Sequence, residues 1–304
     1  MSVNELYRAL YEIVGEGNII ENEPLEKHTT FRIGGPARYF LKPDSAETLK
    51  EAILICKEHN IDFYVIGNGS NLLVSDRGYD GVVIKIDENF RKIRCEEDKI
   101  YATAGATLAG IAQTALKNSL TGFEFAAGIP GTLGGALVMN AGAYGGEMKQ
   151  VVESAKLLDS EGNFVVLSNE ELELGYRTSI IPKKGYIVLS AVIKLDYTEN
   201  REAISVRMSE LAAQRREKQP LEFPSAGSTF KRPEGYFAGK LIMDAGLRGF
   251  SIGGAAVSEK HCGFVINKGG ATADDVMRLI EHVRATVFDK FGVELEPEVK
   301  LLGF

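Results

Sequence analysis

The sequence predicts an α+β protein built from three lobes, and three observations support that fold class. The chain has 304 residues, which is more than one hydrophobic core usually holds. Strand-like runs alternate with helix-like segments along the chain. Two glycine-rich stretches, residues 67–71 and 128–146, interrupt this alternation. We therefore expect lobes at residues 1–87, 88–198 and 199–304.

The first lobe should begin with an amphipathic helix over residues 3–14, because its apolar residues recur at helical spacing. Residues 22–36 should be extended and rich in turns. Asp44 or Ser45 caps a second helix that runs to about His59. Strands are expected at residues 63–66, 72–74 and 82–86.

The second lobe should contain a pair of strands within residues 92–104, joined by an acidic turn at residues 96–98. A helix from Thr107 to Asn118 should follow, and then the long glycine-rich stretch. Further strands are expected at residues 151–159, 163–167 and 186–195, the first two being joined by a hairpin turn.

The third lobe should begin with a charged helix over residues 199–218. A loop bounded by Pro220 and Pro224 follows it. The lobe should close with a helix over residues 272–291 and a strand over residues 299–302.

The composition argues against several classes of function. The net charge is −7 and the chain has no dense Lys/Arg block, so we expect no nucleic-acid partner. The 3 cysteines are odd in number and widely spaced, so neither a disulfide framework nor a metal site is expected. No secretory signal and no apolar run of about 18 residues occurs, which indicates a cytoplasmic protein without a membrane partner.

The first glycine-rich stretch follows a predicted strand, as a phosphate-binding loop does. It reads Gly67, Asn68, Gly69, Ser70, Asn71. It is not a dinucleotide-binding fingerprint, because a leucine stands where the third glycine would fall. Its backbone N–H groups could still hold a diphosphate. A plain strand–turn–strand connection explains the pattern equally well.

The second stretch holds 7 glycines interleaved with apolar residues. Pro130 and Gly131 could open a short helix at Thr132, whose N-terminus would favour a phosphate. The alternative is close packing of a helix on a sheet. Taken together, two glycine-rich surfaces favour an extended dinucleotide between two lobes.

Three other segments are unconvincing when each is considered alone. Arg177 lies in a polar connection, where most arginines are solvated. Ser228 has no nearby histidine in the sequence and would be a poor nucleophile. Glu298 is more typical of the entry to a strand than of a catalytic acid.

In combination, these segments resemble the MurB family of UDP-N-acetylenolpyruvoylglucosamine reductases. The matching segments occur in the family's order and cover almost the whole chain; they are residues 29–35, 67–72, 128–136, 140–142, 176–179, 226–231 and 295–299. The resemblance implies a two-lobe FAD-binding domain of the vanillyl-alcohol oxidase/PCMH type and a C-terminal α/β substrate domain. It also implies noncovalent FAD, NADPH as reductant and a UDP-sugar substrate.

The resemblance also assigns residues to the site. The catalytic positions of the family fall on Arg177, Ser228 and Glu298. The positions expected to contact the cofactor are Thr30, Arg32, Gly34, Gly67, Asn68, Gly69, Ser70, Asn71, Gly128, Pro130, Gly131, Thr132, Gly134, Gly135, Asn140 and Gly142. The positions expected to contact the substrate are Tyr176, Lys218, Lys231, Arg232 and Lys240.

The chemistry of the reaction gives each catalytic residue type a role. Hydride delivery to the enolpyruvyl group builds negative charge that spreads into the substrate carboxylate. We assign the stabilisation of that charge to Arg177, with Glu298 as a hydrogen-bonding partner or acid. We assign the proton that the adjacent carbon must gain to Ser228.

Two departures from the longer class of the family stand out. The connection between Arg177 and Tyr186 is short and has no room for the inserted loop whose tyrosine covers the substrate. The chain therefore resembles the shorter class. Arg232 stands where the longer class has an asparagine, and Lys240 is a substitute contact for the diphosphate. We expect a monomer or a weak dimer.

Two rival functions remain open from the sequence. One is a different FAD enzyme of the same fold, such as an oxidase, for which His28 is the one candidate for covalent flavin attachment near the cofactor loops. The other is a noncatalytic nucleotide-binding or interaction module.

Overall fold

The chain divides into two compact units that are each discontinuous in sequence. The computed structural model describes residues 3–304, and describes side chains from residue 5 onward. The first unit holds the chain up to Glu21 together with Tyr39–Asn68 and Gly81–Arg215. The second holds Asn22–Arg38, Gly69–Asp80 and Arg216–Phe304. Residues 1 and 2, which the expected first lobe includes, lie outside the described residues.

These units differ from the three contiguous lobes expected from the sequence. Residues 22–38 and 69–80, which we expected in the first lobe, belong to the same unit as the C-terminal segment. The lobe boundaries after residues 87 and 198 remain a prediction.

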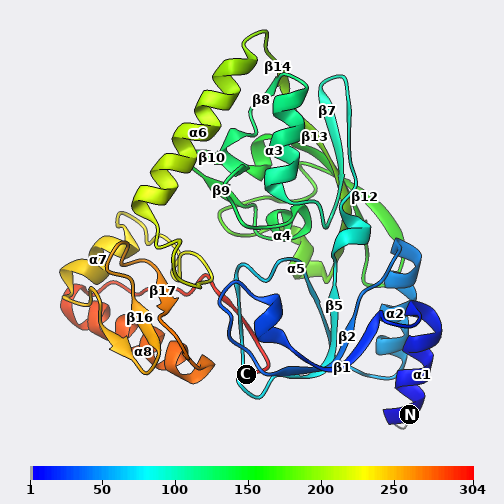
Figure 1. Cartoon of the computed structure of the whole chain (residues 1–304), viewed down its shortest axis with the longest axis horizontal. Helices are drawn as coiled ribbons and strands as arrows, with labels where there is room; N and C mark the ends of the chain where they lie inside the picture. The colour runs from blue at the N-terminus through cyan, green and yellow to red at the C-terminus, as the bar shows by residue number, and fades with distance from the viewer. Residues whose placement is uncertain (1–2) are drawn as a thin grey trace. The chain divides into compact units, whose positions relative to one another are not determined.

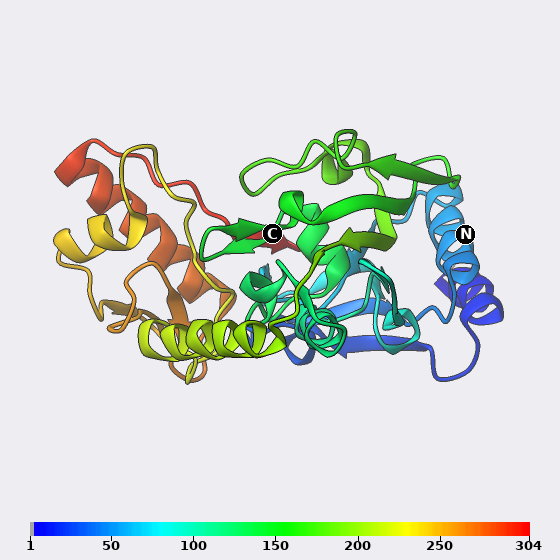
Figure 2. The same cartoon turned by 90° about the horizontal axis from the view of Figure 1, so that it is seen from above.

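The first unit contains most of the helices and strands (Figures 1 and 2). Its longer elements are α1 (Val3–Val14), α2 (Ala46–Glu58), β3 (Phe63–Ile66), β6 (Ile93–Glu96), β7 (Lys99–Thr103), α3 (Leu108–Lys117), α4 (Leu133–Val138), β11 (Val152–Leu158), β12 (Phe164–Ser168), α5 (Ile180–Lys184) and β13 (Ile187–Lys194). Four further elements have residues in both units, namely β1 (Ile19–Pro24), β2 (Pro36–Leu41), β5 (Tyr79–Lys85) and α6 (Arg201–Lys218). Its short strands are β8 (Leu120–Thr121), β9 (Gly142–Ala143), β10 (Gly146–Glu147) and β14 (Asp196–Tyr197).

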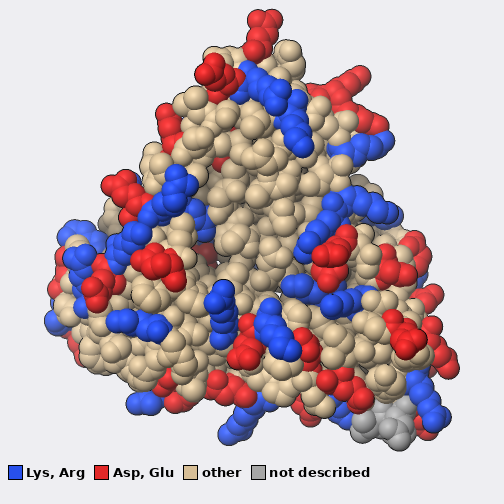
Figure 3. Space-filling view, in the orientation of Figure 1, with Lys and Arg blue, Asp and Glu red and all other residues tan. Residues whose placement is uncertain are grey.

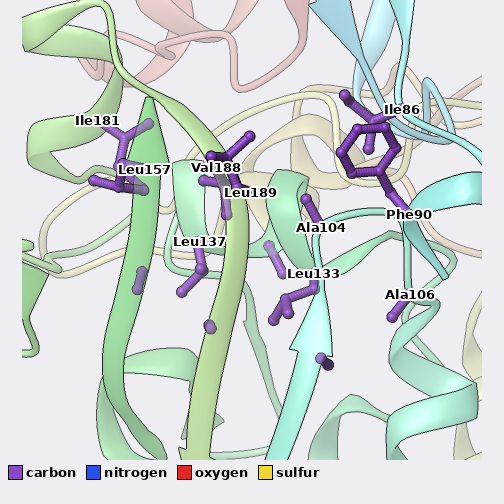
Figure 4. Close-up of a cluster of buried hydrophobic side chains, with 14 of the residues drawn as sticks. Ile86, Phe90, Ala104, Ala106, Leu133, Leu137, Leu157, Ile181, Val188 and Leu189 are labelled. Atoms are coloured by element: carbon purple, nitrogen blue, oxygen red, sulfur yellow. The ribbon is translucent and has the colours of Figure 1, made fainter. Parts of the chain in front are cut away.

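Two sheets organise the first unit. One has the strand order β1-β2-β5-β3, with β3 and β5 parallel. The other has the order β12-β11-β13-β7-β6, and all of its neighbouring strands are antiparallel. The short helix α4 packs on this second sheet. Figure 4 shows its buried Leu133 and Leu137 beside Val188 and Leu189 of β13. The glycine-rich stretch is thus anchored by a hydrophobic core.

The helices of the first unit begin where their capping residues predict. The Thr48 backbone N–H donates to Ser45 Oγ over 3.1 Å at the start of α2. The Gly110 backbone N–H donates to Thr107 Oγ1 over 3.1 Å at the start of α3. Both side chains replace partners that the first turn of a helix lacks. The predicted helices at residues 3–14, 45–59 and 107–118 are therefore confirmed.

The second unit is smaller and has its own core. Its elements are β4 (Leu72–Val74), α7 (Ala238–Asp244), β15 (Ser251–Ile252), β16 (Ala255–Val257), β17 (Val265–Asn267), α8 (Ala273–Phe291) and β18 (Lys300–Leu302). Strands β15, β16 and β17 form an antiparallel sheet, and β18 pairs in parallel with β4. Thr272 caps α8 by accepting a hydrogen bond from the Asp275 backbone N–H. The predicted helix at 272–291 is confirmed.

The described residues contain no helix long and apolar enough to cross a bilayer. Within the same residues, no group of three or more His, Cys, Asp and Glu side chains is arranged to hold a metal ion. Basic and acidic side chains are interspersed over the face drawn in Figure 3.

Candidate active site

The two glycine-rich stretches meet inside the first unit. Gly67 follows β3 directly, and a Cβ built on it would lie 2.3 Å from Thr132 Oγ1. The Asn68 Nδ2 donates to the Pro130 carbonyl over 3.4 Å. No larger residue fits at Gly67 without displacing Thr132. Glycine at this position is therefore explained by the close approach of one stretch to the other.

Two backbone N–H groups at the start of α4 already donate hydrogen bonds to carbonyl groups of the protein. The backbone N–H groups of Leu133 and Gly134 donate to the carbonyls of Ala106 and Ala104 over 2.9 and 2.8 Å. These two amides are not available to a phosphate, which narrows the expected anion site at the helix start. Gly135 is different: it is exposed, and a Cβ on it would meet no atom closer than 3.9 Å.

Residues near the end of the long glycine-rich stretch form hydrogen bonds with the turn that contains Arg177. The Asn140 Nδ2 donates to the Gly175 carbonyl over 3.0 Å and to Glu147 Oε2 over 3.1 Å. The Arg177 Nη2 donates to the Gly142 carbonyl over 3.3 Å. Asn140 is completely buried, so its side chain serves this turn. We now expect Asn140 to act on the cofactor site indirectly.

Arg177 has a left-handed backbone conformation. Its φ is +53°, and the backbones of Gly175 and Thr178 pair across the Tyr176-Arg177 turn. Non-glycine residues adopt such a conformation infrequently. The short connection after the turn forms α5, which leaves no inserted loop. The exposed Tyr176 ring lies 5.4 Å from the Arg177 guanidinium carbon.

The second unit holds six of the cofactor candidates, namely Thr30, Arg32, Gly34, Gly69, Ser70 and Asn71, whereas Gly128 and Gly131 lie in the first unit. Thr30 Oγ1 donates to the Ser225 carbonyl over 2.7 Å. Gly69 has a φ of +59° and closely approaches the His28 carbonyl. Asn71 Nδ2 donates to the Glu298 carbonyl over 3.2 Å. Three further candidates differ in exposure: Arg32 is exposed, while Gly34 and Ser70 are half-buried.

The second unit brings Ser228 and Glu298 together. The Glu298 backbone N–H donates to the Thr229 carbonyl over 2.8 Å, and Phe230 pairs with Pro297. Thr229 is itself fixed, because its Oγ1 accepts from the Val265 backbone N–H over 2.8 Å. Ser228 is exposed, whereas Glu298 is only 8% exposed. The backbone pairing thus places the segment of an exposed serine next to the segment of a buried glutamate.

The predicted substrate residues have varied surroundings. Lys231 forms an ion pair with Glu296, and Lys240 Nζ lies 2.7 Å from Asp244 Oδ2. The guanidinium carbon of Arg232 lies 4.0 Å from the centre of the Phe237 ring. Lys218 is exposed at the end of α6. Arg177 and Tyr176 belong to the first unit and these residues to the second, so the convergence of all of them on one ligand stays a prediction.

The sequence analysis missed two residues that shape the site. Lys85 donates from Nζ to the Gly67 carbonyl over 2.5 Å. Thr229 joins the segments of Ser228 and Glu298, as described above. The position of Lys85 directly after the apolar run Val82–Ile84 was a visible signal for its role. Nothing in the sequence distinguishes Thr229 from an ordinary strand residue.

Comparisons with known proteins identify the family of the chain. Residues 37–168 match a family described as an FAD binding domain, and residues 219–302 match the C-terminal domain of UDP-N-acetylenolpyruvoylglucosamine reductase. A reductase of that name from Lachnoclostridium phytofermentans is 56% identical over 99% of this chain and 98% of its own length. Another from Caldanaerobacter subterraneus is 55% identical over 97% of both chains. The crystal structure of MurB from Thermus caldophilus superposes with a TM-score of 0.79 at 36% identity, over 93% of this chain and 98% of that one.

The class of protein is therefore that of the FAD-dependent oxidoreductases, with an FAD-binding domain followed by the C-terminal domain of this reductase family. Within that class, the chain belongs to the family of UDP-N-acetylenolpyruvoylglucosamine reductases, or MurB. The predicted fold class, the family and the FAD cofactor are confirmed.

The residues present fit FAD. Gly135 leaves its backbone open at the surface of α4, where a Cβ would fill space that a flat or anionic group could occupy. Gly67 and Asn68 hold the first stretch against the second. Both features are what a backbone-lined dinucleotide site requires.

Proposed function

We propose that the protein reduces the enolpyruvyl group of UDP-N-acetylglucosamine enolpyruvate to give UDP-N-acetylmuramate, with NADPH as the reductant. The reaction belongs to peptidoglycan precursor synthesis. The observation that carries the proposal is the pairing of the Ser228 and Glu298 segments through Thr229, in a chain of this family. This pairing supports the proposal because it brings the segments of the proposed proton donor and of the proposed acid together.

Each catalytic residue has a defined task in this proposal. FAD, when bound and reduced by NADPH, supplies the hydride to the terminal carbon of the enolpyruvyl group. Arg177 binds the substrate carboxylate and stabilises the negative charge that spreads into it. Ser228 donates a proton from its hydroxyl to the adjacent carbon. Glu298 supports this step as a hydrogen-bonding partner or acid.

The proposed partners follow from the reaction. They are a UDP-sugar and NADPH, and Lys218, Lys231, Arg232, Lys240 and Tyr176 remain the candidates for substrate contacts. Because NADPH and nucleotide sugars are cytoplasmic reagents, we propose a cytoplasmic location. No nucleic acid, membrane or metal is required, and a monomer or weak dimer stays our expectation.

A stopped-flow experiment tests the proposal. The purified flavoprotein is reduced with NADPH without oxygen and is then mixed with the enolpyruvyl UDP-sugar. We expect the flavin absorbance to return with one equivalent of substrate. Failure of the substrate to reoxidise the flavin would contradict the proposal. Oxygen consumption without NADPH would favour an oxidase, and a protein that cannot take up flavin would favour a noncatalytic module.

A further inference from the structure

We propose that Lys85 is a positioning residue of the cofactor site: its ammonium group fixes the Gly67 turn and supplies the positive charge that attracts the FAD diphosphate to it. The inference rests on FAD binding at the glycine-rich stretches. It goes beyond the proposed function by assigning a role to a residue outside both of those stretches.

The strand register places Lys85 at the turn. Strands β3 and β5 are parallel, and Ile66 is paired with Lys85 at the end of both strands. Gly67 is the next residue, and Lys85 Nζ donates to its carbonyl over 2.5 Å. The Ile86 backbone N–H donates to the Ile66 carbonyl over 2.9 Å and continues the pairing. The position of the ammonium group is therefore set by the sheet.

The opposite side of the turn is fixed by the second glycine-rich stretch. Thr132 is 3% exposed and its Oγ1 occupies the space that a Cβ of Gly67 would need. Asn68 bonds to the Pro130 carbonyl. The turn is thus held between the ammonium group of Lys85 and the stretch that leads into α4. Loss of the Lys85 hydrogen bond would leave the contacts of the turn with Thr132 and Pro130 in place.

The charge on Lys85 is costly, which indicates that the site uses it. Burial lowers the pKa of the Lys85 ammonium group to about 8. Among the neighbouring charges, Asp87 raises that pKa, whereas Arg91 and Lys42 lower it. A neutral side chain could donate to the Gly67 carbonyl without the cost of burying a cation. In the proposed complex, the attraction between the ammonium group and an anionic ligand beside the turn offsets this cost.

This arrangement makes FAD binding dependent on pH. In the apoenzyme, Lys85 is charged below a pH of about 8 and loses its proton above it. A bound diphosphate favours the charged form and therefore raises the pKa of Lys85 in the complex. FAD binding then takes up a proton between the two pKa values, so affinity is highest below pH 8 and falls as the pH rises.

The test measures FAD affinity instead of turnover. Apoenzyme is titrated with FAD by flavin fluorescence from about pH 6.5 to about pH 9.5, a range that spans the pKa of Lys85. For the wild type we expect the dissociation constant to rise on the order of tenfold in total as the pH increases above 8, with the steepest slope between the pKa of Lys85 in the apoenzyme and its pKa in the complex. We expect Lys85→Met to weaken binding at pH 7 on the order of tenfold and to abolish the slope. Lys85→Arg should keep most of the affinity without the slope, because its charge does not titrate in this range.

Lys57→Met is the matched control. Lys57 also donates to a backbone carbonyl in the first unit, that of Ser160, and it is exposed. This variant should retain the wild-type affinity and slope. The proposal is overturned if Lys85→Met binds FAD as the wild type does. It is also overturned if Lys85→Met and Lys85→Arg lose affinity equally and keep the slope, since that result indicates a structural role alone. A wild type that binds no FAD would instead contradict the proposed function.

Discussion

Ser228 and Glu298 differ in exposure although their segments are bonded to each other. The exposed hydroxyl can reach a ligand, whereas the buried carboxyl group depends on its neighbours for its orientation. Thr229 keeps the two segments in register through its backbone carbonyl and its hydroxyl group. Thr229 is therefore the residue that connects the exposed serine with the segment of the buried glutamate.

Replacing Ser228 separates the two half-reactions. We predict that Ser228→Ala leaves reduction of the flavin by NADPH unchanged, because no proton is needed at the substrate carbon in that step. Reoxidation by substrate should slow by roughly 10²–10⁴-fold, the usual contribution of a general acid. Stopped-flow absorbance measures both rates. Ser251→Ala, at an exposed serine of the same unit, should change neither rate. Equal losses in both half-reactions would contradict the assigned role.

Single residues were predictable from the sequence only where a motif contained them. Arg177, Ser228 and Glu298 came from resemblance, because composition and spacing gave each a more ordinary explanation. Lys85 was missed because its role depends on the pairing of β3 with β5, which brings residue 85 next to residue 67. Asn140 was assigned to the cofactor, but its burial and its bond to Gly175 indicate support of the Arg177 turn.

At the scale of elements, the helix α4 has a buried apolar face and an exposed position that is occupied by glycine. Leu133 and Leu137 anchor it in the core of the first unit (Figure 4), while Gly135 is exposed on its surface. A glycine inside a helix is usually unfavourable. Its presence at an open position is explained if a ligand must lie against the backbone there.

This explanation predicts opposite effects on stability and on cofactor binding. Gly135→Ala should stabilise the apoenzyme by about 0.5–1 kcal/mol, because alanine favours the helix and its Cβ meets nothing closer than 3.9 Å. The same variant should bind FAD at least tenfold more weakly, a loss of about 1.4 kcal/mol. Urea unfolding of the apoenzyme and fluorescence titration with FAD measure the two effects.

Gly134→Ala serves as the comparison. Its Cβ would lie 3.2 Å from Ala104 Cβ, so we expect the apoenzyme itself to lose stability. Unchanged FAD affinity in Gly135→Ala would show that this face of α4 is not part of the cofactor site.

Elements with caps and long periodic faces were predicted well, as were the short strands β4 and β18, whereas the shortest strands and α5 were not predicted. The helices α2, α3 and α8 carry capping residues and four or more buried apolar positions each. Strands such as β14 and β15 contain 2 residues, and α5 contains 5. Elements of that length have no periodicity to detect. They form because neighbouring segments offer partners for their backbones.

At the scale of the whole molecule, the discontinuous units are the feature that the sequence did not reveal. Contiguous lobes are the natural expectation from a linear pattern. The segment 69–80 instead joins the second unit, through the pairing of β4 with β18 and through Asp76. The two carboxylate oxygens of Asp76 accept from the backbone N–H groups of Ala273 and Asp274 over 2.8 and 3.1 Å. This side chain therefore caps α8 from a distant part of the chain.

Removing that side chain should weaken the second unit. We predict that Asp76→Ala lowers the free energy of unfolding by about 1–2 kcal/mol, the range for loss of a helix cap with its favourable charge. Denaturant titration followed by circular dichroism measures the loss. Asp80→Ala is the control, because Asp80 is 89% exposed in its ion pair with Arg38 and should contribute little. Equal stability of the Asp76 and Asp80 variants would exclude the proposed attachment.

The parallel pairing of β18 with β4 has a consequence for biosynthesis. Residues 72–74 are translated long before their partners at 300–302. The stretch Gly69–Asn71, which directly precedes β4, therefore lacks an ordered flank until residues 300–302 have been translated. We expect a nascent chain to take up the yellow pigment only after that point.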